Sequence, residues 1–484
     1  MKALSSRSSY RADVPKNIGG KKFWNCLDTH GNRTALIDTT TARSMSYRAL
    51  ATAVVDGARR LTRSGKGLVC IALRNDLEGV LCYLSALASG HAVLVCSQQE
   101  LAGGNSSLLS RYEPDVILWR ENASPVELAP HRHIPLPEIF GYKAAASVAA
   151  NTFVHPDLAL LLLTSGSTGS SKSVRLSYAN IASAARQVAS ALRMEAHERT
   201  LLSLSLHHIY GLSVLHSSLE AGGCLILGAS NVMRREFWGI CQAQSATLIS
   251  LVPTQLKFIS SIATDKIPIP AGLKLTTSGA ALDASTREWL ASMLINKGAS
   301  IYSMYGMTES AGRIAVLAPE EFTTTPTSVG HVVTGGKLTI ASDGEIVYSG
   351  PNVMMGYASD YRQLGEGDEL KGSLRTGDVG HIDARGNLYI SGRISRFAKV
   401  LGARICLDDI ETELSEVAEV AVTGDDASIQ VFHSTANGPE LSTRMRHLAA
   451  LMGIPHSVFV LRQVSRIPRT ATGKVCYANL PGAM

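Results

Sequence analysis

A short loop of small residues carries the types of side chain that bind phosphate. It begins after the apolar run Leu160 to Leu163 and reads Thr164-Ser165-Gly166-Ser167-Thr168-Gly169-Ser170-Ser171-Lys172. Glycines let backbone N–H groups converge on an anion, hydroxyl groups add donors, and the lysine adds a positive charge. The sequence therefore predicts a phosphate site built from Thr164, Ser165, Gly166, Ser167, Thr168, Gly169 and Lys172.

The same loop also comes close to the Walker pattern of P-loop ATPases. Gly166 to Ser173 fits G-x-x-x-x-G-K-[ST], except that Ser171 stands where the second glycine belongs. In a Walker loop the lysine opens a helix, whereas residues 173–177 alternate as a strand does and the helical pattern starts only after Ser177. A P-loop ATPase stays open as a second hypothesis, and a Ser/Gly turn without a ligand as a third.

Composition and charge limit the class of protein. The 484 residues suffice for about three domain-sized units, and 45% hydrophobic with 18% charged residues is typical of a soluble globular protein. The net charge of +6 is mild and no block of five like charges occurs, so nucleic acid is not expected as a partner. No apolar run reaches the roughly 18 residues of a transmembrane segment.

Cysteine usage indicates the compartment. The eight cysteines are scattered, mostly in apolar strand-like runs, and no C-x-x-C occurs. This pattern favours reduced thiols over a disulfide framework or a zinc site. Residues 1–20 are polar and do not resemble a signal peptide. We therefore expect a cytoplasmic protein.

Strand-like and helical patterns alternate along most of the chain. Strand-like runs occupy 67–73, 91–96, 224–227 and 247–252, and a helical segment occupies 78–90. This alternation predicts βα units with buried parallel strands. Past Thr327 the segments become short and glycine-punctuated, at 337–340, 344–348 and 387–390.

These patterns predict an α/β fold in two domains. Residues 1–392 would form a large N-terminal domain of βα-layered subdomains with a small β-rich subdomain. Residues 393–484 read as a small, compact α+β unit.

Five further motifs stand in a fixed order along the chain. They are Tyr305-Gly306-Met307-Thr308-Glu309, Gly344-Glu345 leading into Gly350-Pro351-Asn352-Val353-Met354-Met355-Gly356-Tyr357, Leu374-Arg375-Thr376-Gly377-Asp378, Gly392-Arg393-Ile394-Ser395-Arg396 and Pro468-Arg469-Thr470-Ala471-Thr472-Gly473-Lys474. Each motif alone is a weak signal. The ordered set, with the loop at 164–172, resembles the acyl-adenylate-forming superfamily of acyl- and aryl-CoA synthetases, luciferases and peptide-synthetase adenylation domains, over nearly the whole chain.

The resemblance implies that residues 1–392 bind ATP and the acid and that residues 393–484 form a mobile lid domain that carries Lys474. It also implies a role for each site residue. The 164–172 loop would cover the β- and γ-phosphates of ATP, Thr308 would bond the α-phosphate, and Glu309 would be the Mg²⁺ ligand. Tyr305 and Gly306 would form the adenine side, with Tyr305 stacking on the base. The remaining nucleotide contacts would come from Ser278, Gly279 and Ala280 at the base edge, Asp378 on the ribose hydroxyls with Arg393 in support, and Lys474 on the α-phosphate.

The expected chemistry explains why these residue types are needed. Attack of a carboxylate on the α-phosphate brings two anions together, so Mg²⁺ and positive charge must offset the repulsion. The catalytic set implied by the resemblance is Lys474, Thr308, Glu309 and His208. Taken singly, Lys474 also fits a solvated lysine, Asp378 a turn residue and Tyr305 a core aromatic. One function accounts for all of them together.

The segment Leu206 to Val214 indicates the acid. It contains no aspartate or glutamate to pair with a substrate ammonium, and an unpaired buried ammonium costs several kcal/mol. An α-amino acid is therefore excluded, and an aliphatic or aryl acid is expected. The spacing of His208 and Gly211 resembles acyl- and aryl-CoA synthetases, which makes His208 a candidate gate; a core histidine is the alternative.

The expected reaction has two steps and an open choice of acceptor. ATP and the acid would give acyl-AMP and pyrophosphate, and the thiol of CoA would then displace AMP. A separate acyl carrier protein with a phosphopantetheine arm is the alternative acceptor, and an inactive binding protein on the same fold is a remote one. Ser395 stands where most relatives carry a charged hinge residue. The chain would act as a monomer or homodimer.

Overall fold

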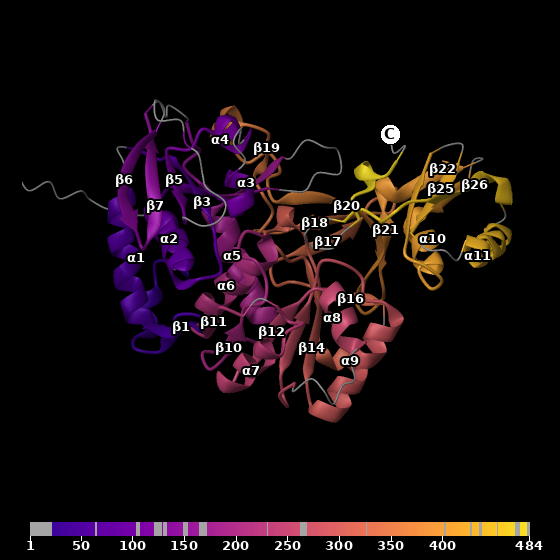
Figure 1. Cartoon of the computed structure of the whole chain (residues 1–484), viewed down its shortest axis with the longest axis horizontal. Helices are drawn as coiled ribbons and strands as arrows, with labels where there is room; N and C mark the ends of the chain where they lie inside the picture. Colours follow the sequence, from indigo (N-terminus) through magenta and orange to yellow (C-terminus); the bar gives the residue numbers. More distant parts are fainter. Residues whose placement is uncertain are drawn as a thin grey trace, which may run out of the picture.

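The computed structural model describes most of the chain. The described residues are 22–62, 65–102, 107–120, 128, 133–148, 153–163, 172–229, 231–261, 269–325, 327–400, 403–425, 428–434, 438–452, 454–469 and 475–481. Two large sheets with helices packed on them form most of the molecule, and a smaller C-terminal part lies beside β20 (Ser373–Ile382) and β21 (Leu388–Arg393) (Figure 1). The predicted α/β class is confirmed.

The first large sheet has eight strands in the order β19-β9-β8-β4-β3-β5-β7-β6. They are β19 (Gly356–Ala358), β9 (Ser173–Ser177), β8 (Leu158–Leu163), β4 (Ala92–Cys96), β3 (Leu68–Ala72), β5 (Val116–Trp119), β7 (Tyr142–Ser147) and β6 (His133–Ile139). The central strands β8, β4, β3 and β5 are parallel. Every residue of β3 and β4 is buried, which explains their continuous apolar sequence.

The second large sheet has thirteen strands in the order β17-β18-β20-β21-β16-β15-β14-β13-β12-β10-β11-β1-β2. Its further strands are β17 (Lys337–Ile340), β18 (Glu345–Ser349), β16 (Ser328–Val332), β15 (Ala315–Leu317), β14 (Ser300–Tyr305), β13 (Lys274–Thr277), β12 (Leu248–Leu251), β10 (Arg199–Leu201), β11 (Cys224–Leu227), β1 (Thr34–Asp38) and β2 (Arg43–Ser46). From β14 to β1 all neighbours are parallel.

Two features of this sheet could not be read from local sequence patterns. The glycine-punctuated strands after Thr327 do not form a sheet of their own, because β15 and β16 connect them to the parallel strands. Near the start of the chain, β1 pairs with β11 and β2 pairs with β1, so both strands belong to the second sheet rather than to the first sheet that follows them in sequence.

Helices fill the space between and around the sheets. They are α1 (Tyr47–Leu61), α2 (Leu77–Ala88), α3 (Gln98–Ala102), α4 (Ser107–Tyr112), α5 (Tyr178–Ala191), α6 (Ile209–Ala221), α7 (Arg235–Ala243), α8 (Pro253–Ser260) and α9 (Ala284–Lys297). Helices α5 and α6 pack on each other between the two large sheets and share their main hydrophobic core (Figure 1). In the described chain, no helix has both the length and the apolar character needed to span a membrane.

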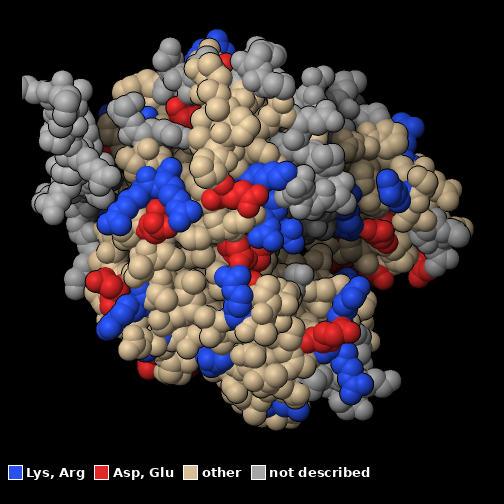
Figure 2. All heavy atoms as spheres, turned by 60° about the vertical axis from the view of Figure 1, so that its left-hand side comes forward, with Lys and Arg blue, Asp and Glu red and all other residues tan. Residues whose placement is uncertain are grey.

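The C-terminal part is an α+β unit with its own core. It contains β22 (Phe397–Val400), β23 (Ala403–Cys406), α10 (Leu407–Leu414), β24 (Val420–Gly424), β25 (Ile429–His433), α11 (Gly438–Leu451) and β26 (Phe459–Gln463). Ile410, Val422 and Val431 belong to a hydrophobic cluster of residues from this part alone. All eight cysteines are free thiols. On the face drawn in Figure 2, acidic and basic side chains are interspersed, as the mild net charge predicts.

Candidate functional site

Two of the predicted groups lie outside the described residues. These are Lys474 and the loop residues Thr164, Ser165, Gly166, Ser167, Thr168 and Gly169. The residues next to them are described: Leu163 pairs with Ser173 between antiparallel β8 and β9, and Arg469 forms a bridge with Val475. Both gaps therefore connect backbone segments that lie side by side.

The residues after Lys172 distinguish a Walker loop from a strand–loop–strand arrangement. They form β9 (Ser173–Ser177), and helix α5 begins only at Tyr178. The Ser177 hydroxyl accepts the Asn180 N–H at 3.0 Å, and the Asn180 side chain accepts the Ser177 N–H at 2.8 Å, which places the start of the helix here. The helix that a P-loop ATPase requires at Lys172 is replaced by a strand, so this alternative is wrong.

Tyr357 joins the predicted phosphate lysine to the predicted Mg²⁺ ligand. Its hydroxyl donates to Oε1 of Glu309 at 2.7 Å, and Nζ of Lys172 lies 5.9 Å from the centroid of its ring. Burial and the neighbouring Glu309 raise the pKa of Tyr357, so the phenol stays protonated and remains a donor. Its position within the 350–357 motif gave no indication of this role.

A buried asparagine holds the turn that presents Thr308 and Glu309. These two residues lie in a short 3₁₀ helix, Thr308–Ser310. Nδ2 of the fully buried Asn352 donates to the carbonyl oxygens of Ser310, at 2.7 Å, and of Arg313, at 2.8 Å. The glycine-rich motif at 350–357 therefore supports the neighbouring motif from behind. The sequence pointed to the motif and missed Asn352.

Gly306 is required by close packing within the same turn. A Cβ atom at this position would lie 2.1 Å from the carbonyl oxygen of Gly312, closer than real Cβ contacts. The chain reverses here through Ala311 and Gly312, both with positive φ. Gly306 thus allows the turn to fold tightly beneath Thr308.

Asp378, the predicted ribose carboxylate, is buried between two partners. Nε of Arg393 lies 3.0 Å from Oδ1 of Asp378, and the Tyr305 hydroxyl donates to Oδ2. The Asp378 side chain is only 5% exposed, whereas that of Arg393 is 58% exposed. Burial and then Asp378 raise the pKa of Tyr305, which keeps its hydroxyl a donor. The structure therefore brings the predicted adenine residue and the predicted ribose residue together.

Ser278, Gly279 and Ala280, which were predicted to contact the edge of the adenine base, lie at the same edge of the second large sheet as Tyr305. Ser278 follows directly on β13 and is buried, while Gly279 and Ala280 are exposed. Strands β13 and β14 are parallel, so the end of β13 lies beside the end of β14, which leads into Tyr305. Crevices outside the carboxyl ends of parallel strands are common ligand sites in α/β proteins.

His208 lies at the start of helix α6. Its side chain is exposed and its ring centroid is 4.2 Å from that of His207. The reading of His208 as a core histidine is therefore wrong. The helix start is tightly packed, because a Cβ at Gly211 would lie 2.2 Å from the Ser205 carbonyl oxygen.

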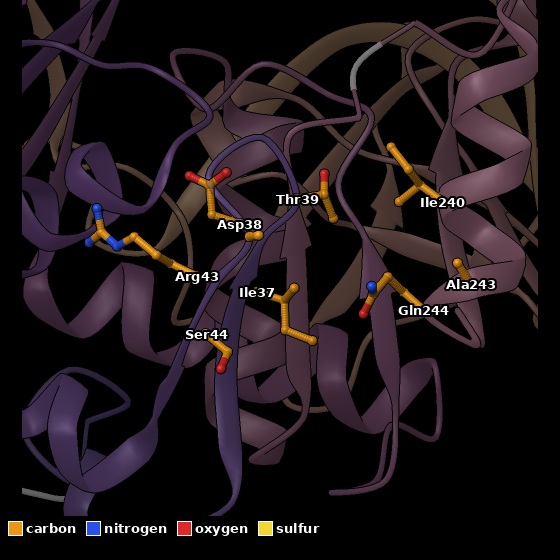
Figure 3. Close-up of a pocket in the computed structure, with 9 residues that line it drawn as sticks. Ile37, Asp38, Thr39, Arg43, Ser44, Ile240, Ala243 and Gln244 are labelled. Atoms are coloured by element: carbon orange, nitrogen blue, oxygen red, sulfur yellow. The ribbon is translucent and has the colours of Figure 1, made fainter.

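A separate pocket of about 510 Å³ lies away from these residues (Figure 3). It is lined from β1, β2 and α7, and includes Asp38, Arg43 and Gln244. The Asp38 carboxylate already accepts hydrogen bonds from the backbone N–H groups of Thr40 and Leu77. None of the predicted site residues lines this pocket.

Comparison with known proteins agrees with this geometry. The family model described as AMP-binding enzyme matches residues 23–358. The chain is 29% identical to 2-succinylbenzoate--CoA ligase of Bacillus subtilis (strain 168), over 70% of this chain and 72% of the relative. It is 30% identical to the ligase of the same name from Bacillus licheniformis, over 66% and 69% of the two chains.

A solved structure shows the same fold. The O-succinylbenzoate Coenzyme A Synthetase (MenE) from Bacillus subtilis, in complex with AMP, superposes with a TM-score of 0.75 at 24% identity, covering 96% of this chain and 98% of that one. Together with the family match over most of its length, this establishes that the chain belongs to the AMP-binding enzyme family.

Proposed function

We propose that the protein is an AMP-forming acid–CoA ligase. It activates an aliphatic or aryl carboxylic acid with ATP to an acyl-AMP, releases pyrophosphate, and transfers the acyl group to the thiol of CoA. The observation that carries the proposal is the convergence of Lys172 and Glu309 on Tyr357, together with the pairing of Asp378 with Tyr305. These contacts join residues far apart in sequence, which supports a nucleotide site of the expected kind.

Each side chain has a definable task in this proposal. Lys172 neutralises charge on the phosphates that leave as pyrophosphate, Thr308 donates to the α-phosphate, and Asp378 accepts from the ribose hydroxyls. Glu309 is the protein's ligand for Mg²⁺, which when bound reduces the charge repulsion at the phosphates. Among the described residues, no group of three or more His, Cys, Asp or Glu side chains is arranged to hold a metal ion. A single carboxylate suits Mg²⁺, which retains waters and binds substrate phosphates.

The second part of the proposal concerns the function of the C-terminal unit. Residues 393–484 form a lid that delivers Lys474 to the α-phosphate, and residues 1–392 hold ATP and acid. The cluster of hydrophobic residues restricted to this unit supports a separate domain. CoA as acceptor is supported by the names of the relatives, which are CoA ligases. A phosphopantetheinyl carrier protein is the alternative acceptor.

Lys474→Ala should affect the two half-reactions differently. Loss of one preorganised donor costs roughly 3–4 kcal/mol of transition-state stabilisation, so we expect acyl-AMP formation to fall by two to three orders of magnitude. Thioester formation from supplied acyl-AMP should stay near the parent rate. Lys337→Ala, at an exposed lysine of β17, is the control. Equal loss of both half-reactions, or of neither, would contradict the role of Lys474.

A further inference from the structure

Arg313 is a buried arginine next to the nucleotide turn. Only 2% of the residue is exposed. Its Nε donates to the sulfur of Met304 at 3.1 Å, a weak acceptor, and its Nη1 donates to the carbonyl oxygen of Gly312. The guanidinium carbon lies 4.3 Å from the ring centroid of Tyr210. Among the described residues, the second terminal nitrogen, Nη2, has no hydrogen-bond partner.

No carboxylate neutralises this guanidinium within the described part of the chain. The other deeply buried arginines differ in this respect, because Arg175 pairs with Glu369 and Arg396 pairs with Asp408. Tyr210 cannot serve as a counter-ion, since burial raises its pKa and keeps the phenol neutral. A buried charge without a partner is costly, so a bound anion at Arg313 would be stabilising.

The location of Arg313 connects it to the acid rather than to the nucleotide. Arg313 and Gly312 pack against the first turn of α6, where a Cβ at Gly312 would lie 3.4 Å from Ile209 and from Ser213. This turn begins at His208, the residue proposed to gate the acid. Gly312 and Arg313 also pack against Gly306, where a Cβ would lie 2.7 Å from Cα of Arg313. Arg313 is therefore adjacent to the turn that presents Thr308.

Polar side chains continue from Tyr210 toward the ends of two parallel strands. The Tyr210 hydroxyl is 3.0 Å from Oγ1 of Thr276 on β13, and this Oγ1 donates to Oγ of Ser250 on β12 at 2.8 Å. Thr276 and Ser250 are buried. The region between the first turn of α6 and the ends of β12 and β13 is therefore polar and is positively charged at Arg313.

We propose that Arg313 binds a second carboxylate of the acid substrate, so that the enzyme prefers dicarboxylic acids. This inference rests on the proposed function, because it assigns the class of acid that the ligase activates. One carboxylate of the substrate would face Thr308 and react with ATP. The other would take the free donors of the Arg313 guanidinium, which form the charge-assisted hydrogen bonds that arginine makes with carboxylates.

The test compares dicarboxylic acids with monocarboxylic acids of the same carbon skeleton, in one aliphatic and one aryl series. Binding is measured by calorimetry on the full-length protein with Mg²⁺ and a non-cleavable ATP analogue, and turnover by acid-dependent pyrophosphate release. Charge-assisted hydrogen bonds predict a preference for the dicarboxylic acid of about tenfold to a hundredfold in Kd. Arg313→Met should abolish this preference, and Arg313→Lys should reduce it.

A second arginine provides a matched control. Arg287 also lies 4.3 Å from an aromatic ring centroid, that of Phe322, and donates to two backbone carbonyl oxygens from helix α9. Arg287→Met should therefore keep the preference. Equal binding of both acids by the parent, or an unchanged preference in Arg313→Met, overturns the inference. If Arg313→Met does not fold, an unchanged preference in Arg313→Lys overturns it as well.

The two proposals fail in different ways. If no acid in either series releases pyrophosphate, the ligase function is contradicted, while the binding measurement still decides whether Arg313 selects a second carboxylate. If monocarboxylic acids release pyrophosphate as well as their dicarboxylic partners do, the ligase function stands and the role of Arg313 is overturned.

Discussion

Arg393 and Asp378 face each other across β20 and β21, with Nε of the arginine 3.0 Å from Oδ1 of the carboxylate. Arg393 is the last residue of β21, and the chain then passes through the 3₁₀ helix Ile394–Arg396 into the C-terminal unit. The partner of the proposed ribose carboxylate is therefore the first residue of the proposed lid domain. Movement of the lid about Ser395 would start directly beside the nucleotide.

Asp378→Asn should weaken ATP binding. The amide cannot accept from both ribose hydroxyls and the guanidinium as a carboxylate does, and loss of charge-assisted hydrogen bonds worth about 1.5–3 kcal/mol predicts a rise in the KM for ATP of about tenfold to a hundredfold. Initial rates at varied ATP measure it. Asp343→Asn, at an exposed carboxylate paired with Arg375, is the control. An unchanged KM in Asp378→Asn would argue against ribose binding by this residue.

Glu309→Gln should raise the Mg²⁺ concentration needed for half-maximal activity and lower kcat. The carboxylamide is a weaker ligand for a hard cation than the carboxylate. Tyr357→Phe should shift the Mg²⁺ requirement in the same direction by a smaller factor, because it removes the hydrogen bond that orients Glu309. Glu320→Gln, an exposed glutamate paired with Arg193, provides the comparison. A Mg²⁺ titration of Glu309→Gln identical to the parent would exclude Glu309 as the ligand.

Arg175→Met should destabilise the fold. The Arg175 side chain is fully buried, donates from Nε to the Tyr357 carbonyl oxygen at 3.1 Å and from Nη1 to that of Glu366, and pairs with Glu369. Glu369 is half exposed and can be solvated, but leaving the backbone carbonyl oxygens without their buried donor costs about 1–3 kcal/mol.

Urea unfolding of Arg175→Met and of a surface variant measures this cost. Arg193→Met removes an ion pair with Glu320 in which the arginine side chain is 64% exposed, so its loss should stay below about 1 kcal/mol. Equal destabilisation by the two substitutions would contradict the structural role of Arg175.

Local sequence patterns predicted the elements better than their arrangement. The apolar runs at 68–72 and 92–96 became β3 and β4, and the strand after Lys172 was recognised from five residues. Pairing of β1 with β11 joins segments almost two hundred residues apart, and no local pattern contains that information. Strand neighbours are set by packing across the whole domain rather than by propensity.

In the site, too, residues within known motifs were predicted, whereas residues that act through tertiary contacts were not. Motif order indicated Glu309, Asp378 and Arg393, because their chemistry follows from residue type. Asn352, Tyr357 and Arg313 were missed, because an asparagine, a tyrosine or an arginine acquires its role only from burial and from the atoms it meets. A signal was present for Asn352, whose position inside a glycine-rich motif marks a close approach of backbone.

Acid should destabilise the protein partly through His216. This residue is buried, forms a 2.8 Å hydrogen bond with the Tyr83 hydroxyl and stacks on Phe23. Burial lowers the pKa of His216 from 6.5 to about 3. Between these pH values the unfolded chain binds a proton that the folded chain excludes. The contribution of His216 to stability is therefore complete above pH 6.5 and is lost as the pH falls toward 3, with a slope of about 1.4 kcal/mol per pH unit.

His216→Gln removes this titration. The free energy of unfolding of the variant minus that of the parent should become more positive as the pH falls from 6.5 to 4, measured by urea unfolding at each pH. His456→Gln, at an exposed histidine, is the control substitution. A pH-independent difference between His216→Gln and the parent would show that His216 does not titrate as proposed.

The most direct test of the ligase function is the identity of the nucleotide product. The purified protein is incubated with Mg²⁺, ATP and each acid of the aliphatic and aryl series, with and without CoA. Pyrophosphate, AMP and ADP are then quantified. The proposal predicts acid-dependent pyrophosphate, with AMP accumulating over many turnovers when CoA is present. Release of ADP and phosphate, or no acid-dependent pyrophosphate with any acid, would contradict it.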